Sequence, residues 1–464
     1  MTVIRRLVLI GAAAGLAAAA PCAQAEPRAD AVAAVLALPP GIAPLPKNFT
    51  PGEPAPNWWA VYRDPALDAL IGRLHASSPS LAAAKARLDR ARAEARVEAA
   101  ARLPSLVLDG SASRTTGPLV NQAGQSGDLY AMRAAASWEL DLAGRLSAER
   151  RAGRASVAAE EAELADATLL LEGETARLWF SGQTYALAAS EAEGAAAVLE
   201  ERLAIARARL ERGLVTGAAV DPLRQGLADA RARARDLALS RDRAGRQLGA
   251  LVGSAEPVAF PQAEDIALPP PVEVPAGLPA DILARRPDVR AAAGRVTAAD
   301  ARLSAIRRGW LPPITLTAAQ GQAASGLGQL FATASGLFGL SALLNLPIFN
   351  GGRHRARVAG GGAERDLAEA QYRATVLAVL HEVNDDLQIA AARRTAWDEA
   401  HDGAAAGAAL LRAARGSAAN GTIGRDRLLE AELAARERQL ALTLAHGQAL
   451  ASTITVQQAL GGGW

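Results

Sequence analysis

The chain has 464 residues, of which half are hydrophobic and only 4% are aromatic, and its formal net charge is +2. The 50 basic and 48 acidic residues are interspersed, which excludes nucleic acid as the main partner, because nucleic-acid-binding proteins concentrate basic residues on one face. The abundance of alanine, leucine, arginine and glutamate favours long helices with thin interiors over a large aromatic core.

Residues 1–25 have the pattern of a secretory signal peptide. Two arginines, Arg5 and Arg6, precede an apolar run of about a dozen residues. Ala23-Gln24-Ala25 then has the A-x-A form, which predicts cleavage before Glu26. We therefore expect an exported protein.

The single cysteine, Cys22, allows an alternative in which the chain is lipidated there. Lipoprotein signals prefer a small residue before the cysteine, and this chain has Pro21 at that position. Cleavage before Glu26 would leave no cysteine for a disulfide or a thiolate metal site. In both cases a proline-rich extension over 26–56 is expected to precede the folded part.

The rest of the sequence contains a tandem duplication with a constant offset of 208 residues. These pairs share the offset: Pro79 and Pro287, Pro104 and Pro312, Leu106 and Ile314, Gly144-Arg145 and Gly352-Arg353, Glu174 and Glu382, Gly213 and Gly421, Gly253 and Gly461. No gap is needed between any of them. We therefore predict a first repeat over 57–253, a linker over 254–280 and a second repeat over 281–464.

Each repeat has the same predicted order of elements. A helix of roughly 25 residues starts at the first proline, where a fixed φ is tolerated, and ends before the second proline. A β region follows, and then a proline-free helix over about 146–211 or 354–419. At a rise of about 1.5 Å per residue, each of these helices is roughly 100 Å long. A glycine-containing turn and a return helix complete the repeat, and apolar residues at i, i+3, i+4 and i+7 predict packing against neighbouring helices.

The β regions contain two segments per repeat, so the sequence predicts four strands. Their expected bounds are about 105–116, 130–143, 313–324 and 337–349. In the second segment the apolar side chains alternate with Arg133, Glu139 and Asp141, which share the opposite face. Because a transmembrane strand needs about 9–11 residues, we predict membrane strands whose apolar faces contact lipid. The alternative is a soluble β layer packed on the helices.

The uncharged stretch 330–349 also has the composition of a transmembrane helix. Its counterpart in the first repeat carries Arg133, Glu139 and Asp141, and a charge at mid-bilayer on a lone helix costs at least about 3 kcal/mol. Strands avoid this cost, but four strands cannot close a barrel and lipid does not tolerate unpaired edges. The chain must therefore associate with copies of itself, and the pattern alone leaves two or three copies open.

Six segments resemble the outer-membrane efflux factor family, the channel tunnels of the TolC and NodT type. They are NWWAVYRDPALDALI (57–71), SWELDLAGR (137–145), GLPADILARRPDVRAAA (277–293), LPPITLTAAQG (311–321), LPIFNGGR (346–353) and ALGGGW (459–464). The resemblance implies a mainly α fold of tandem helical hairpins with four membrane strands per chain. It also implies a homotrimer whose twelve strands close one barrel in the outer membrane, with a helical tunnel in the periplasm.

The resemblance further implies the exit duct of a tripartite efflux pump, of RND or ABC type, for small molecules. Such a duct is a passive conduit that opens when a periplasmic adaptor protein docks, while an inner-membrane transporter supplies the energy. The family's adaptor-docking tips match the two helix turns. They are Arg212, Gly213, Leu214, Val215 and Thr216 in the first repeat and Gly421, Thr422 and Ile423 in the second.

An acidic residue just beyond the second tip often narrows the aperture in this family. That position is Glu430 here, with Arg427 three residues earlier and Asp221 near the corresponding place in the first repeat. A ring of three symmetry-related carboxylates would repel itself, attract cations and favour a closed constriction. The alternative for Glu430 is an ordinary solvated helix carboxylate.

The residues offer no enzyme site. His381-Glu382 begins like a zinc-protease motif, but Asp385 occupies the place of the second histidine. The glycine-rich segments 351–357 and 360–362 lack the Lys-Ser/Thr of a phosphate-binding loop. We therefore predict no catalytic residue, cofactor or metal. The alternative to a duct is an exported helical or coiled-coil scaffold without a pore, which would leave the β segments unexplained.

Overall fold

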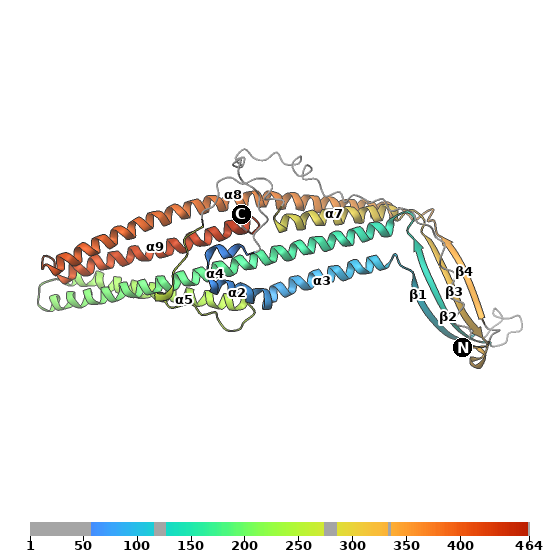
Figure 1. The fold of residues 1–464 in the computed structure, drawn as a ribbon, viewed down its shortest axis with the longest axis horizontal. Coiled ribbons are helices and arrows are strands. Elements are labelled where there is room, and N and C mark those ends of the chain that lie inside the picture. Colours follow the sequence, from blue (N-terminus) through green and yellow to red (C-terminus); the bar gives the residue numbers. More distant parts are fainter. Residues whose placement is uncertain (1–56, 116–126, 273–284, 333–335, 463–464) are drawn as a thin grey trace. The chain divides into compact units, whose positions relative to one another are not determined.

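The long helices of the two repeats lie in one elongated bundle (Figure 1). Their bounds show the same lengths at a constant offset. The computed structural model describes residues 57–115, 127–272, 285–332 and 336–462, all within one compact unit. The helix pairs are α3 (Pro79–Ala100) and α7 (Pro287–Arg308) with 22 residues, α4 (Arg145–Glu211) and α8 (Arg353–Ala419) with 67, and α5 (Gly217–Leu251) and α9 (Arg425–Ala459) with 35. Members of each pair lie 208 residues apart, so the duplicated sequence forms duplicated elements.

Glycine and proline set the ends of these helices. Pro79 and Pro287 are the first residues of α3 and α7, where the missing N–H is not needed. Gly144 and Gly352 precede α4 and α8 with φ of +72° and +82°, a conformation that other residues rarely adopt. These glycines let the chain turn sharply from the β region into each long helix.

The helices pack through small side chains, with α4 at the centre. Helix α4 contacts α3, α5, α7 and α9, while α8 contacts α7 and α9. Ala148, Ala176 and Ala188 of α4 are fully buried, as is Ala291 of α7. Small residues let helix backbones approach closely, which gives the thin alanine-rich interior that the composition predicts. None of the helices in the described ranges combines the length and apolar character that a membrane span requires.

The N-terminal segment adds the largest core cluster. The 3-10 turn η1 (Trp58–Tyr62) and helix α2 (Pro65–Ser77) pack against the middle of α4 and the end of α9. Asp64 caps α2 by accepting hydrogen bonds from Ala66 N and Leu67 N, and it also accepts one from Trp179 Nε1 at 2.7 Å. One carboxylate therefore orders the start of α2 and fixes it to α4.

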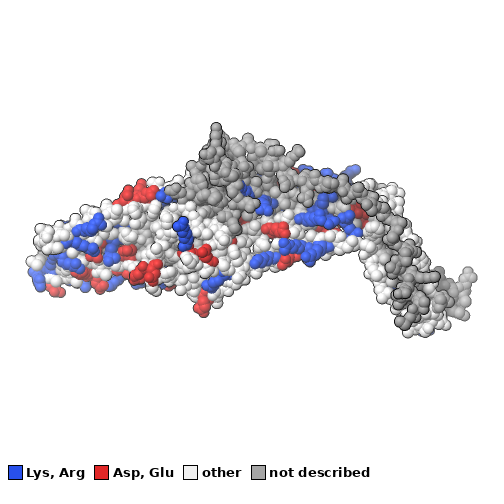
Figure 2. All heavy atoms as spheres, viewed as in Figure 1, with Lys and Arg blue, Asp and Glu red and all other residues white. Residues whose placement is uncertain are grey.

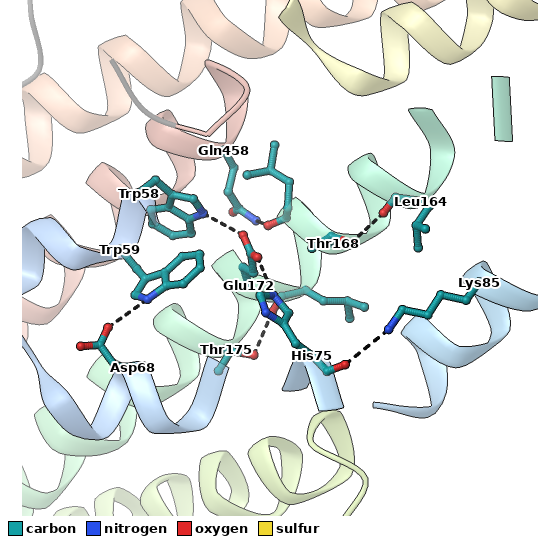
Figure 3. Close-up of polar contacts among 12 residues, drawn as sticks. Trp58, Trp59, Asp68, His75, Lys85, Leu164, Thr168, Glu172, Thr175 and Gln458 are labelled. Carbon is teal, nitrogen blue, oxygen red and sulfur yellow. Dashed lines mark hydrogen bonds and ion pairs between the residues drawn. The ribbon is translucent and has the colours of Figure 1, made fainter. Parts of the chain in front are cut away.

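A second carboxylate, Glu172 of α4, lies beneath the same segment (Figure 3). Trp58 Nε1 donates to it at 3.1 Å, and His75 Nε2 lies 2.7 Å from its other oxygen. The Glu172 side chain is only 9% exposed, and burial raises the pKa of its carboxyl, while the hydrogen bonds from His75 and Trp58 lower it. Because a buried acceptor without donors is costly, the two bonds hold η1 and α2 in place on α4.

Trp58→Phe removes one donor from Glu172 and is expected to lower the free energy of unfolding by about 1–3 kcal/mol, since the buried acceptor loses its partner. Trp397→Phe is the matched control, because Nε1 of Trp397 has no hydrogen-bond partner among the residues that the structure describes. Thermal unfolding of the detergent-solubilised protein measures both changes. Equal losses in the two variants would contradict a stabilising Trp58–Glu172 bond.

A buried guanidinium joins three helices of the second repeat, α7, α8 and α9. Arg286, only 8% exposed, donates to Asp288 at 2.9 Å, to Glu382 of α8 at 3.0 Å and to Ala459 O of α9 at 2.8 Å. Asp166 of α4 faces this group. Burial, followed by the negative charges of Asp288 and Glu163, raises the pKa of Asp166 to about 6.

Asp166→Asn is expected to flatten the dependence of stability on pH. The native pKa of Asp166 lies above its ordinary value of 3.8, so between these values the native state binds more protons than the unfolded chain. The contribution of protonated Asp166 is therefore complete below about pH 4 and is lost as pH rises through about 6. From pH 4 to 7 the wild type should lose about 1–3 kcal/mol more stability than the variant.

Thermal unfolding across this pH range measures the difference. Asp229→Asn, which changes an exposed carboxylate on α5, is the control and should follow the wild type. Parallel curves for wild type and Asp166→Asn would contradict the raised pKa.

The β segments form one antiparallel sheet in the order β1-β2-β3-β4. The strands are β1 (Ser105–Thr115), β2 (Gly127–Leu140), β3 (Ile314–Ala324) and β4 (Gly336–Leu344). The register places Asp109 opposite Arg133, Arg133 opposite Gly321, and Gly321 opposite Leu337. Strands β1 and β4 form the two edges, so each has one side without a partner strand within the described chain.

Two strands depart from their predicted ends. Strand β2 begins earlier, at Gly127, and stops at Leu140, because Asp141 turns to accept hydrogen bonds from Leu146 N and Ser147 N at the start of α4. Strand β4 stops at Leu344 instead of continuing to 349, because its ladder with β3 ends there and Pro347 has no N–H to extend it.

Several predicted segments lie outside the described residues. They are the signal peptide (1–25), Cys22, the proline-rich extension (26–56), position 116 of the first strand, and the end of the linker with the start of the second repeat (273–284). Residues 254–272 of the predicted linker contain one short turn, η2 (Ala263–Asp265). They pack on the helices through Val258 N, which donates to Gly245 O at 2.9 Å, and through Pro269 O, which lies 2.8 Å from His446 Nε2.

Candidate channel wall and helix tips

One face of the sheet carries most of its large apolar side chains and is interrupted by Gln320 and Gln322 of β3. Side chains directly opposite each other in neighbouring strands share a face, so the register decides which residues lie together. This face carries Leu106 and Leu108 of β1, Trp138 of β2, Leu316 of β3, and Phe338, Leu340 and Leu344 of β4. Leu106, Phe338 and Leu340 are each about three-quarters exposed, at 76%, 77% and 74%. A soluble β layer packed on the helices would cover this face, and within the described chain nothing does.

The opposite, more polar face carries Asp109, Arg133 and Glu139 beside the apolar Leu337 and Leu343. The remaining charged pair of the strands, Arg114 and Asp128, lies on the apolar face, at the end of the sheet away from the helices. Arg133 Nη2 donates to Asp109 at 3.3 Å, and both side chains are more than half exposed. Gly321, opposite Arg133, has no room for a side chain, because a Cβ there would lie 2.5 Å from Met132 O and 3.1 Å from the Arg133 Cβ. The small residue thus lets β3 approach β2 beneath the arginine.

A polar network joins the sheet to the helices in the first repeat. Arg145 donates to both oxygens of Glu139, at 2.8 and 3.0 Å, and to Glu149 at 2.8 Å. On the apolar face, Trp138 Nε1 donates to Arg102 O at 2.9 Å. These bonds fix the end of β2 to the start of α4 and to the segment after α3.

The two predicted tips have matching geometry. Gly213 and Gly421 adopt φ of +69° and +73°, which reverses the chain at the ends of α4 and α8. In both turns the following residue donates back to the helix, from Leu214 N to Arg209 O and from Thr422 N to Ser417 O, each at 2.9 Å. Of the eight docking candidates, Val215 and Ile423 are half-buried and the other six are exposed.

Ion pairs connect α4 to α9 beside these tips. Arg202, with a side chain 15% exposed, donates to Asp426 at 3.1 Å and lies 4.0 Å from Glu430. Arg425 donates to both oxygens of Glu201 at 2.6 and 2.7 Å. The start of α9 is therefore held to α4 by charges of both signs.

The predicted gate residues do not form one group within the chain. Arg427 donates to Glu430 at 2.9 Å, one turn away on α9. Asp221 instead accepts from Arg224, one turn away on α5. The sequence reasoning missed Arg202 and Asp426, and its only available signal was the pair of adjacent opposite charges at 201–202 and 425–426.

The described part of the chain contains no cluster of three or more His, Cys, Asp or Glu that could hold a metal ion. Glu382, which follows His381, is engaged with Arg286 at 3.0 Å. A groove of about 730 Å³ between α4, α5 and residues 257–264 is lined by charges of both signs, with Arg241 donating to Asp242 at 2.8 Å. An exposed sheet face rich in apolar side chains, joined to paired long helices, is typical of a membrane channel protein.

The family of this channel protein is shown by sequence. The family model for outer membrane efflux proteins matches residues 70–254 and 278–462. The chain therefore belongs to the outer membrane efflux protein family.

Individual relatives agree. The toluene efflux pump outer membrane protein TtgC of Pseudomonas putida is 29% identical over 415 residues, which cover 88% of this chain and 85% of TtgC. The probable outer membrane lipoprotein SilC of Salmonella typhimurium is 26% identical and covers 91% of this chain and 93% of SilC. The crystal structure of VceC of Vibrio cholerae matches with a TM-score of 0.75 and 26% identity, covering 88% of this chain and 99% of VceC.

The resemblance to the efflux factor family is thus confirmed. The protein is an outer-membrane component of an efflux system, and its location is the outer membrane. The alternative of an exported scaffold without a pore is not supported. The relatives of this chain are efflux channel proteins and not enzymes.

Proposed function

We propose that three copies of this chain close a twelve-stranded barrel in the outer membrane, which the helices extend as a tunnel into the periplasm. The observation that carries this proposal is a four-stranded sheet with two open edges and an exposed apolar face. In lipid, the unpaired N–H and C=O groups of β1 and β4 must find partners, and the β4 edge of one copy can pair with the β1 edge of the next. Each chain is then one third of the wall.

This pore is the exit duct of a tripartite pump for small molecules. The tips at Arg212–Thr216 and Gly421–Ile423 dock a periplasmic adaptor, and an inner-membrane transporter of RND or ABC type supplies the energy. The chain itself is a passive conduit with no catalytic step and no cofactor. The name of TtgC, a component of a toluene efflux pump, supports this assignment. The name of SilC supports lipidation at Cys22 as the alternative to cleavage before Glu26.

Two adjacent residues of β4 test the barrel, because they lie on opposite faces of the sheet. Leu340→Lys places a charge on the apolar face and is expected to prevent membrane insertion, since lysine facing lipid near the bilayer midplane costs about 2–4 kcal/mol per chain. Ser341→Lys is the matched control on the polar face. It should insert normally and shift the ion selectivity of the pore towards anions.

Outer-membrane fractionation, heat-labile trimers on gels and conductance in planar bilayers measure the outcome. Equal insertion of the two lysine variants would contradict the assignment of faces. Conductance without any trimer would contradict the barrel.

The tip ion pairs support a gate proposal in which α9 of each chain is held inward by α4. Arg202 shares its charge between Asp426 and Glu430, so the proposed carboxylate ring at Glu430 is partly neutralised within each chain, by Arg202 and Arg427. Opening then requires these links to break, and adaptor docking at the neighbouring turns is placed to break them.

Arg202→Gln is expected to raise the conductance of the isolated channel severalfold, because a charge-assisted hydrogen bond between half-buried groups contributes about 1.5–3 kcal/mol. Arg90→Gln removes the same charge from an exposed pair confined to α3, Arg90 and Glu94, and should leave conductance unchanged. Single-channel recordings in planar bilayers measure both. A closed state that survives Arg202→Gln would rule out this link as a restraint.

A further inference from the structure

The second repeat joins its strand to its long helix through a segment that is both apolar and basic. Leu346, Ile348 and Phe349 are 53%, 89% and 88% exposed. Arg353, Arg355 and Arg357 follow, at the start of α8, and all three are exposed. Among the residues that the structure describes, none of these three guanidinium groups has an ion-pair or hydrogen-bond partner.

The duplication provides an internal control for this junction. In the first repeat Arg145 is satisfied by Glu139 and Glu149. In the second repeat the equivalent arginine is Arg353, and the two acidic positions are occupied by Pro347 and Arg357. Equivalent junctions, both with a left-handed glycine before the long helix, therefore hold an ion-pair network in one repeat and a set of free cations in the other.

The surroundings of this junction are also basic. The four segments where helices meet the sheet, 95–104, 139–154, 301–310 and 345–360, hold twelve arginines and four carboxylates. Figure 2 shows lysine and arginine gathered over the helices near the sheet, while the described part of the sheet is mainly uncharged. Trp310, which is 38% exposed, packs against His354 with ring centroids 5.2 Å apart. The junction between helices and sheet therefore also contains an exposed aromatic side chain.

We propose that segment 346–357 is a binding surface for anionic phospholipids of the periplasmic leaflet. Leu346 and Ile348 continue the apolar face of β4 into the acyl chains, while the three arginines bind lipid phosphates. Guanidinium groups bind phosphate oxygens in a bidentate manner, and basic residues at a membrane surface attract anionic headgroups. Aromatic side chains such as Trp310 prefer the same interfacial depth. This inference rests on the proposed function, which places the sheet in the outer membrane.

A neighbouring copy of the chain is a poorer occupant for this surface. Of the four carboxylates at the junction, Glu139 and Glu149 already bind Arg145, and Asp141 caps α4. A second copy therefore has few unpaired carboxylates at the helix–sheet junction with which to bind these arginines. The exposed Ile348 and Phe349 also favour an apolar environment, which a lipid supplies together with the phosphate.

The test compares two triple variants with the wild type. Arg353→Gln/Arg355→Gln/Arg357→Gln removes the three cations of the junction. Arg207→Gln/Arg412→Gln/Arg415→Gln removes three exposed arginines near the other ends of the long helices and is the matched control. Each protein is placed in nanodiscs containing equal amounts of phosphatidylethanolamine and phosphatidylglycerol. It is then extracted in mild detergent, and mass spectrometry quantifies the retained lipids.

Wild type and control should retain phosphatidylglycerol enriched about fivefold or more over the bulk ratio. The junction variant should fall to the bulk ratio. In the wild type, extraction in high salt should abolish the enrichment, because salt screens the attraction. The high-salt comparison uses only the wild type, so it tests the proposal even when the junction variant fails to fold.

Enrichment that is equal in all three proteins, or absent from the wild type, would overturn the proposal. So would a junction variant that keeps its phosphatidylglycerol but loses its heat-labile trimers, since the surface would then contact another copy. Conductance in neutral bilayers, measured in parallel, tests the pore separately. A conducting wild type without enrichment refutes the lipid surface and leaves the duct intact.

Discussion

In the proposed barrel, the requirement that every backbone N–H and C=O group in lipid be paired governs the rest of the structure. The chain supplies four strands, so β1 and β4 each leave one side unpaired within the described residues, and the proposed contact of the exposed apolar face with lipid places these edges in the bilayer. A single copy cannot satisfy them, and adding unrelated chains would require a matching register. In the proposed assembly, pairing of β4 with β1 of the next identical copy satisfies both edges with one kind of interface.

In the proposed tunnel the helices meet a different constraint, because they form the wall and leave the space between the copies open. Fully buried alanines along α4 bring four neighbouring helices close without large side chains. Contacts between alanines bury little apolar surface per residue, so hydrogen bonds and ion pairs at a few positions fix how the helices pack. Asp64 and Glu172 hold the N-terminal segment, and Arg286 gathers α7, α8 and α9 around one charge. The wall is thin along its length and anchored at these points.

Local patterns predicted much of this fold. The offset of 208 residues gives helices of identical length, and alternation in 130–143 separates the two faces of β2. What the patterns missed depends on distant partners. Asp141 belongs to the alternating pattern, yet it leaves the strand because the first N–H groups of α4 need an acceptor. At the tips, the Arg427–Glu430 pair follows from helix spacing. The Arg202–Asp426 pair joins residues 224 apart, and no local pattern specifies which helices meet.

Duplication explains how one backbone plan can serve two roles. Both repeats need the same sharp turn from strand to helix, so Gly144 and Gly352 keep the same left-handed conformation. The side chains around the turn differ between the repeats. In the first repeat, acids at 139 and 149 bind Arg145 and close the junction within the chain. In the second repeat, Pro347 ends the strand ladder and Arg357 adds a charge, so the cations of this junction have no acidic partner within the described chain. In the proposed trimer, three ion-paired junctions would alternate with three unpaired ones, and the proposed lipid surface belongs to the unpaired junctions.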